Sequence, residues 1–209
     1  NRITHFDSSN YKTKLSAEVN IDLNNYFNKK ELNKIDRFTA FALIASNEAI
    51  IDAKIDKTID KNRVGVIIGS GIGGINTLEK EHTKSLKSPR RVSPYFVPSM
   101  ISDIAAGHIS IKYGFKGPNF SVVSACASSN HAIGMAFKSI KYNESDIVIT
   151  GGSEAGITPL SIAGFMNMKA LSTEQNRNKA SIPFDLNRNG FVMGEGSGIL
   201  VLESLKSAL

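Results

Sequence analysis

The only cysteine of the chain, Cys126, is the residue best suited to covalent chemistry. A β-branched run ending at Val123 precedes it, and a run of helical character follows from about Ala127. This order predicts a strand, a sharp turn and a helix, with the thiol at or near the helix N-terminus. Unpaired backbone N–H groups and the helix dipole favour a thiolate nucleophile there, and the N–H of Cys126 could face the oxyanion of an attacked carbonyl. On this pattern alone a buried structural cysteine is the alternative, because free cysteines are among the most buried residues.

No histidine makes a convincing base for this thiol. His131 follows Cys126 by five residues, so on a helix it should lie about 7.5 Å further along the axis and point away. We interpret it as a packing or surface histidine, and His108 belongs to another predicted helix. The four histidines and one cysteine are scattered without the spacing of zinc ligands, so no metal site is predicted.

Two glycine motifs suggest rival chemistries, and both are incomplete. The stretch Gly69–Gly74, "GSGIGG", matches the dinucleotide fingerprint after a strand. The fingerprint also needs an acidic residue about 20 positions on, where this chain is basic and broken by prolines. We therefore interpret these glycines as sites of close backbone packing, with Ile72 pointing into a cavity. The stretch Gly151–Ala155, "GGSEA", resembles a hydrolase nucleophile elbow, but it ends in alanine and no histidine follows His131 to complete a triad.

The composition is that of an ordinary globular chain. Its 209 residues are 41% hydrophobic and 21% charged, with a net charge of +6. No apolar run reaches the roughly 18 residues of a membrane span, and no stripe of Lys and Arg with interleaved aromatics indicates nucleic-acid binding. The basic charge is compatible with an acidic protein partner, and the single cysteine favours a reducing, cytoplasmic location.

Predicted strands and helices alternate along the chain. Residues 1–37 are expected to form loops and a short charged helix start, whereas 88–100, with three prolines, and the polar stretch 173–190 should be irregular. Strands are expected within 62–74, 119–125, 145–155 and 191–205, and helices within 36–55, 75–87, 101–114, 127–143 and 158–172. Because several strands are continuous apolar runs, we expect an α/β fold whose sheet is covered on both faces.

Four blocks resemble, in order, the β-ketoacyl-acyl-carrier-protein synthases, the condensing enzymes of fatty acid synthesis. The blocks are Ser93–Asn119, Val123–Gly134, Ile149–Ser172 and Pro183–Glu203. The match is closest to the type II elongating synthases and runs from about Ile35 to the end. It implies a thiolase-like fold of two similar α/β halves, layered α-β-α-β-α. Residues 1–209 would then be mainly the N-terminal half, truncated at both ends and without the second half.

The resemblance also implies roles for individual residues. Cys126 becomes the acyl-accepting nucleophile, with its own N–H as one oxyanion donor. Apolar residues match positions lining the acyl pocket, Ile72 and Phe165 in the same subunit and Phe96 and Val97 across a dimer interface. Basic residues match, more loosely, positions that face the acidic carrier protein: Arg90, Arg91, Lys169, Lys30 and Lys34. Plain core packing for the apolar residues and simple solvation for the basic ones are the alternatives.

The implied activity is a decarboxylating Claisen condensation between an acyl group on Cys126 and malonyl-acyl-carrier protein, giving the 3-oxoacyl product without a cofactor. Two histidines, a lysine and a second oxyanion donor would come from the absent half, so the chain alone should be inactive. A homodimer is expected, with the strand Asn119–Ser124 pairing with its copy. The alternatives are a polyketide-type ketosynthase and a non-catalytic module that binds acyl carrier. A chain-length factor is disfavoured, because those relatives lack the cysteine.

Overall fold

The computed structural model describes residues 1–55 and 58–208 and divides into two compact units. The sheet unit comprises residues 22–154 and 197–209, and the loop-rich unit comprises Asn1–Ile21 and Ala155–Gly196. Among the described residues, no helix is both long and apolar enough to cross a membrane.

A four-stranded sheet in the order β2-β1-β3-β4 forms the centre of the sheet unit. The strands are β1 (Val64–Gly69), β2 (Asn119–Val122), β3 (Ile147–Glu154) and β4 (Gly196–Glu203). Strand β1 is parallel to both β2 and β3, with Ile67 opposite Phe120 on one side and Thr150 on the other. The hydroxyl of Ser197 donates to the carbonyl of Gly152, and the N–H of Ser204 donates to that of Asp146, so β4 runs antiparallel to β3.

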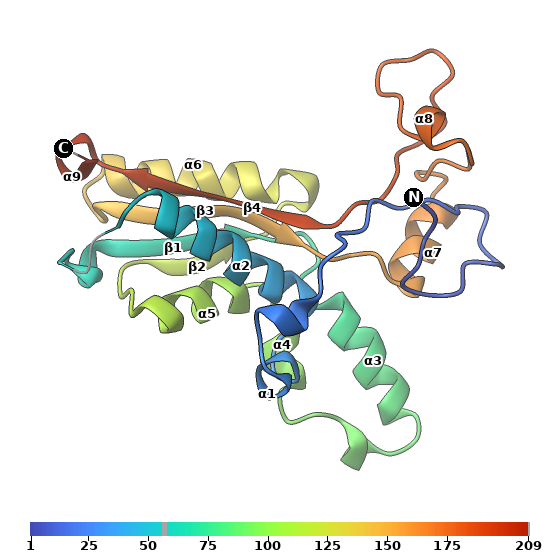
Figure 1. Ribbon diagram of the computed structural model, residues 1–209, viewed down its shortest axis with the longest axis horizontal. Helices are drawn as coiled ribbons and strands as arrows, with labels where there is room; N and C mark the ends of the chain where they lie inside the picture. The colour runs from blue at the N-terminus through green and yellow to red at the C-terminus, as the bar shows by residue number, and fades with distance from the viewer. Residues whose placement is uncertain (56–57, 209) are drawn as a thin grey trace. The chain divides into compact units, whose positions relative to one another are not determined.

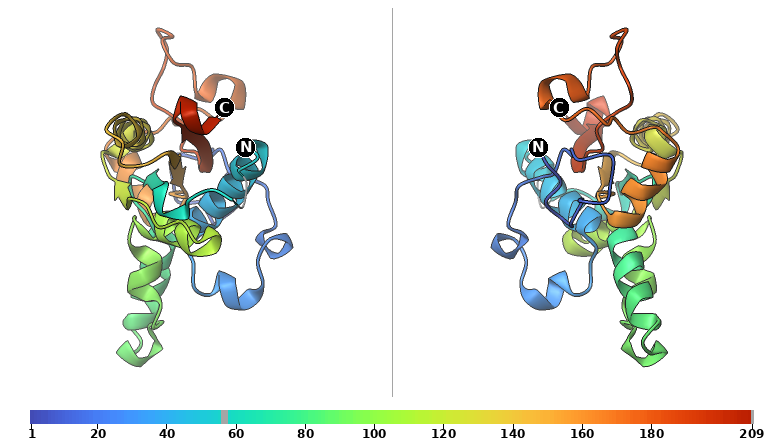
Figure 2. Two further views of the ribbon diagram at one scale, coloured as in Figure 1. Left: turned by 90° about the vertical axis from the view of Figure 1, so that its left-hand side faces the viewer. Right: turned by 90° about the vertical axis from the view of Figure 1, so that its right-hand side faces the viewer.

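Helices cover both faces of this sheet (Figures 1 and 2). Helix α6 (Ser128–Lys141) lies on one face, where its Ala132 and Ala136 pack against Ile67 and Val148. Helices α2 (Arg37–Asp52) and α5 (Ile104–Tyr113) lie together on the other. Because β1 is buried along its whole length, its apolar run matches a strand enclosed between two helical layers. The expected α/β class and the covering of both faces are confirmed.

The ends of the helices follow local chemistry that the sequence displays. Asp36 caps α2 by accepting the N–H of Phe38 at 3.3 Å, and it also accepts the N–H of Thr77 at 2.7 Å. Burial raises the pKa of this carboxyl despite those hydrogen bonds. Helix α5 ends at Gly114, whose φ of 73° is the left-handed conformation that glycine adopts without strain.

Most of the remaining elements in this unit are short. They are the 3₁₀ helices η1 (Leu23–Asn25), η2 (Lys61–Arg63), η3 (Pro89–Arg91) and η4 (Ala125–Ala127) and the α-helices α1 (Lys29–Leu32), α3 (Ile75–Ser85), α4 (Phe96–Met100) and α9 (Leu205–Ala208). The prediction of an irregular segment at 88–100 is therefore wrong in part. Pro98 is the third residue of α4, within the first turn, where the missing N–H would have no partner inside the helix.

The loop-rich unit has a small apolar core of its own. Its buried members are Ile3, Ile157, Ile162, Leu171 and Met193. Helix α7 (Pro159–Asn167) supplies part of this core, and the N-terminal segment is tied to the glycine-rich stretch by a bridge between Ala17 and Gly194. The polar stretch 173–190, expected as a loop, contains the single-turn helix α8 (Arg177–Ala180), which Asn176 caps through the N–H of Asn178.

Candidate active site

Cys126 lies in η4, the turn between β2 and α6, and its side chain is exposed. The predicted order of strand, turn and helix is confirmed. Because β1, β2 and β3 are parallel, the segments that follow them meet at one edge of the sheet, which we call the carboxyl edge. The thiol therefore sits where ligands of parallel sheets usually bind, two residues before the first residue of α6.

The turn around the cysteine is strained and held by one hydroxyl. Ala125 has a φ of 51°, a left-handed conformation that costs a residue with a side chain about 1–2 kcal/mol. The Ser128 hydroxyl donates to the carbonyl of Ala125 at 2.6 Å and accepts the N–H of Ser124 at 2.9 Å. Ser128 is only 4% exposed, so these hydrogen bonds are protected from water and fix the turn.

His131 is exposed, as expected of a surface histidine, but its ring is also tied to the cysteine turn. Its Nδ1 lies 2.6 Å from the hydroxyl of Ser124, two residues before Cys126. This hydrogen bond was not predicted from the sequence. It adds a second restraint from α6 on the same turn, and it occupies one ring nitrogen with Ser124.

Close backbone contact explains two of the glycines at the carboxyl edge. A Cβ at Gly69 would lie 2.4 Å from backbone atoms of Ser128, and a Cβ at Gly152 would lie 2.5 Å from the Cβ of Ser129. The first turn of α6 therefore rests directly on the ends of β1 and β3. The close packing predicted for the glycines of Gly69–Gly74 is confirmed at Gly69.

The loop after β1, whose sequence matches the dinucleotide fingerprint, has its amides committed to an internal carboxylate. Glu154 accepts the N–H of Gly71 at 2.6 Å and that of Ile72 at 3.3 Å, and the Ser70 hydroxyl donates to it at 3.3 Å. The N–H of Gly73 donates to the Ser70 hydroxyl at 3.1 Å. A phosphate would need these same donors, so the loop is not a nucleotide cradle in this fold.

Burial raises the pKa of Glu154 above its ordinary value, although the hydrogen bonds from the loop act in the opposite direction. Neither this residue nor Ser128 is among the site residues predicted from the sequence. A carboxylate at the end of an apolar strand and a serine at a helix start were the available signals. Neither signal identifies a partner, because Gly71 and Glu154 are 83 positions apart.

The proposed acyl-pocket residues are found at three places. Ile72 follows Gly71 in the glycine loop of the sheet unit and is 38% exposed. Phe96 and Val97 are the first two residues of α4, and Val97 is 57% exposed. Phe165 belongs to α7 in the loop-rich unit, where it packs against that unit's core. Its ring meets that of Phe191 edge to face, with 5.8 Å between the ring centres.

The basic residues matched to carrier docking are all exposed. Arg90 and Arg91 are in η3, and the ammonium of Lys34 lies 5.2 Å from the centre of the Tyr95 ring, just before α4. Lys30 is in α1, and Lys169 is in the loop-rich unit with a φ of 58°. The structure thus brings Lys34 beside the segment that leads into α4.

In the described part of the chain, no three His, Cys, Asp or Glu side chains are grouped so as to hold a metal ion. The chemistry that the described residues offer at the carboxyl edge is that of an exposed thiol on a rigid turn before a helix, next to a loop that carries Ile72.

A family model described as "Beta-ketoacyl synthase, N-terminal domain" matches residues 5–208. The 3-oxoacyl-[acyl-carrier-protein] synthase 2 of Staphylococcus aureus is 49% identical over 99% of this chain and 52% of its own length. The enzyme of the same name from Synechocystis sp. is 46% identical over 99% of this chain and 51% of its own length. The solved ishigamide ketosynthase/chain length factor has a TM-score of 0.88 at 25% identity, covering 100% of this chain and 51% of that one. The chain thus spans about half the length of the curated relatives it matches.

Proposed function

Because the chain belongs to the β-ketoacyl synthase family, we propose that the complete protein is a 3-oxoacyl-[acyl-carrier-protein] synthase of fatty acid elongation. Relatives of that name at 49% and 46% identity support this assignment over a polyketide-type ketosynthase. Residues 1–209 are the N-terminal half of its thiolase-like fold. The observation that carries the proposal is the exposed thiol of Cys126 on the turn between β2 and α6.

Acyl transfer begins when the Cys126 thiolate attacks the carbonyl of an acyl thioester on the carrier. A sulfur–carbon bond forms, the oxyanion faces the N–H of Cys126, and collapse breaks the original thioester bond and expels the carrier thiolate, which takes up a proton. Ile72 and Phe165 are assigned to the acyl pocket, and Phe96 and Val97 to the pocket of the neighbouring subunit, on the resemblance alone.

Condensation follows on the acyl-enzyme. Malonyl-carrier loses CO2, the carbanion attacks the acyl carbon, and the Cys126 thiolate leaves, which gives 3-oxoacyl-carrier two carbons longer. The resemblance assigns the decarboxylating histidines and the lysine to the second half of the family's fold. Residues 1–209 therefore supply the nucleophile and the acyl pocket, and no metal or redox group enters either step.

Two partners complete the proposal. The acidic carrier docks on the exposed basic residues Arg90, Arg91 and Lys169, with Lys30 and Lys34 as weaker candidates. A second copy of the chain pairs with β2, which is an edge strand among those described and is followed directly by Val123, a residue 60% exposed. The single cysteine supports a reducing, cytoplasmic setting.

Replacement of Cys126 by alanine in the complete protein tests the assignment. Wild type incubated with acyl-carrier should gain the acyl mass, whereas Cys126→Ala should gain none and unfold at the same temperature as wild type. Iodoacetamide should label wild type at Cys126 faster than it labels free cysteine. A Cys126→Ala protein that is still acylated, or a thiol no more reactive than free cysteine, would exclude the enzyme and favour a carrier-binding module. Loss of folding in Cys126→Ala would favour a structural cysteine.

A further inference from the structure

Glu154 is a half-buried carboxylate that the proposed chemistry does not use. It ends β3 and binds the loop from Ser70 to Gly73 through the hydrogen bonds described above. Buried carboxylates are costly unless their charge is offset, so one placed beside a proposed active site calls for an explanation.

The loop that Glu154 holds touches the cysteine turn. A Cβ at Gly71 would lie 3.4 Å from the carbonyl oxygen of Ala125 and 2.9 Å from Oε2 of Glu154. Gly71 is therefore enclosed between the carboxylate and the strained residue that precedes Cys126. If the loop moved away from Glu154, Gly71 would no longer pack against the carbonyl of Ala125 in the cysteine turn.

The same loop carries the proposed acyl-pocket residue. The N–H of Ile72 lies 3.3 Å from Oε2 of Glu154 and 3.4 Å from Oε1, so its backbone position depends on this carboxylate. Only a carboxylate offers acceptors alone to the N–H groups of Gly71 and Ile72 and the hydroxyl of Ser70. Glutamine would place an NH2 group among donors, and aspartate would be one methylene too short.

We propose that Glu154 is a positioning residue that sets the place of the acyl chain relative to Cys126 by holding the loop of Gly71 and Ile72 against the cysteine turn. This inference rests on the proposed function, since it concerns the acyl transfer assigned to Cys126. Glu154 acts through the loop and does not touch the reacting atoms.

The test measures acylation of Cys126 in the complete protein with acyl-carriers of short and long chains. Glu154→Ala should lower the rate at saturating donor by about 100-fold for long chains, because a misplacement of about 1 Å can cost that much. Glu154→Gln, which keeps the shape and one acceptor, should lose about threefold. The loss should grow with chain length, whereas the small reagent iodoacetamide should label Cys126 at a rate within about twofold of wild type.

Asp146→Asn is the matched control, because Asp146 flanks the same strand at its other end and lies in no proposed site. It should acylate like wild type. The inference is overturned if Glu154→Gln and Glu154→Ala acylate like wild type, if their loss is equal for all chain lengths, or if Asp146→Asn shows the same loss. If Glu154→Ala fails to fold, the chain-length dependence of Glu154→Gln decides alone. Failure of the wild type to take any acyl group would instead overturn the proposed function.

Discussion

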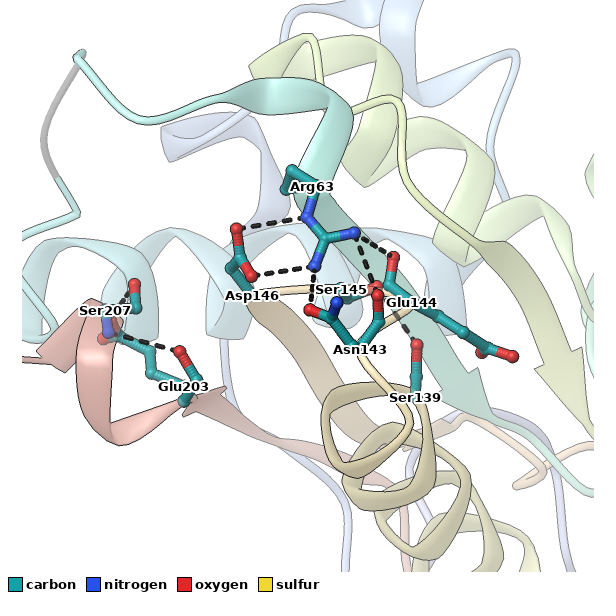
Figure 3. A network of polar contacts seen from close by, with 9 residues as sticks. Arg63, Ser139, Asn143, Glu144, Ser145, Asp146, Glu203 and Ser207 are labelled. Atoms are coloured by element: carbon teal, nitrogen blue, oxygen red, sulfur yellow. Dashed lines mark hydrogen bonds and ion pairs between the residues drawn. The ribbon is translucent and has the colours of Figure 1, made fainter.

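Strand β3 has a carboxylate at each end, and the two ends of the sheet use these groups differently. At the opposite edge of the sheet, where β3 begins and which we call the amino edge, Asp146 receives two hydrogen bonds from Arg63, at 2.9 and 3.1 Å (Figure 3). Both side chains are partly exposed. At the carboxyl edge Glu154 is half-buried and receives backbone N–H groups without a cationic partner among the hydrogen bonds described.

The two environments shift the pKa values of these two carboxyl groups in opposite directions. The hydrogen bond from Arg63 holds the pKa of Asp146 below its ordinary value, whereas burial raises that of Glu154. Around Arg63, the backbone carbonyls of Asn143 and Glu144 and the side-chain Oδ1 of Asn143 accept the remaining guanidinium N–H groups (Figure 3). The amino edge thus carries an ion-pair network that water can reach, and the carboxyl edge combines close backbone contact with a half-buried carboxylate that lacks a cationic partner among the hydrogen bonds described. Such a concentration is typical of functional sites.

The largest expected effect is steric and lies at the carboxyl edge. Gly69→Ala places a methyl group 2.4 Å from backbone atoms of Ser128, so we expect a loss of about 3 kcal/mol in the free energy of unfolding. Chemical denaturation measures it. Gly134→Ala is the control, because Gly134 lies in α6, the helix that packs on Gly69, and no atom lies within 4 Å of the added methyl group. This variant should be more stable than wild type by about 0.5–1 kcal/mol. Equal effects at the two glycines would break the comparison.

The next effect separates two serines of α6 that are equally buried, at 4% exposure. Ser128→Ala removes two hydrogen bonds from the strained turn and should cost about 2 kcal/mol. Ser139→Ala, at the amino edge, removes one contact to Ser145 of 3.1 Å and should cost about 1 kcal/mol. Urea midpoints give both values. The rate of iodoacetamide labelling of Cys126 should change only in Ser128→Ala, and a change in both would contradict the division into two edges.

A smaller effect is expected from the charges at the amino edge. Arg63→Ala should lower the free energy of unfolding only slightly, because an exposed ion pair gains little even when it is bidentate. The loss should shrink in high salt, which screens exposed charges. Thermal unfolding at low and high ionic strength measures it, with Arg63→Lys as a variant that keeps the charge without the two-pronged geometry. A loss of stability as large as that of Gly69→Ala, or one insensitive to salt, would contradict the description of Arg63 and Asp146 as an exposed ion pair.

The smallest expected effect is the change of stability with pH, which should have opposite signs for Asp146 and Glu154. The lowered pKa of Asp146 contributes stability that is present above its ordinary pKa of 3.8 and is lost as the pH falls through the folded value. The raised pKa of Glu154 contributes stability that is present below its ordinary pKa of 4.5 and is lost as the pH rises through the folded value.

Acidification should therefore reduce the unfolding free energy of wild type relative to that of Asp146→Asn. It should raise the unfolding free energy of wild type relative to that of Glu154→Gln. Unfolding free energies measured from neutral to acidic pH give both gaps. Two gaps that move in the same direction would contradict the assigned environments.

The sequence predicted the elements of the fold well where the pattern was strong. The β-branched run at β1, the helical period of α2 and the stop at Gly114 all appear as expected. It failed at 88–100, because Pro98 is compatible with a helix when it falls in the first turn. Neither Glu154 nor Ser128 was predicted at the site, since their importance depends on partners.

What the sequence determined by itself is local: a thiol between a strand and a helix, glycines after β1, and caps and stops at helix ends. These follow from backbone preferences and side chains a few positions apart. The tertiary structure alone decided that the amides after β1 bind Glu154, 83 positions away, and that Gly71 lies beside the carbonyl of Ala125. Such pairings arise because parallel strands bring their carboxyl ends to one edge, and which buried carboxylate meets which unpaired amides there depends on strand order and register.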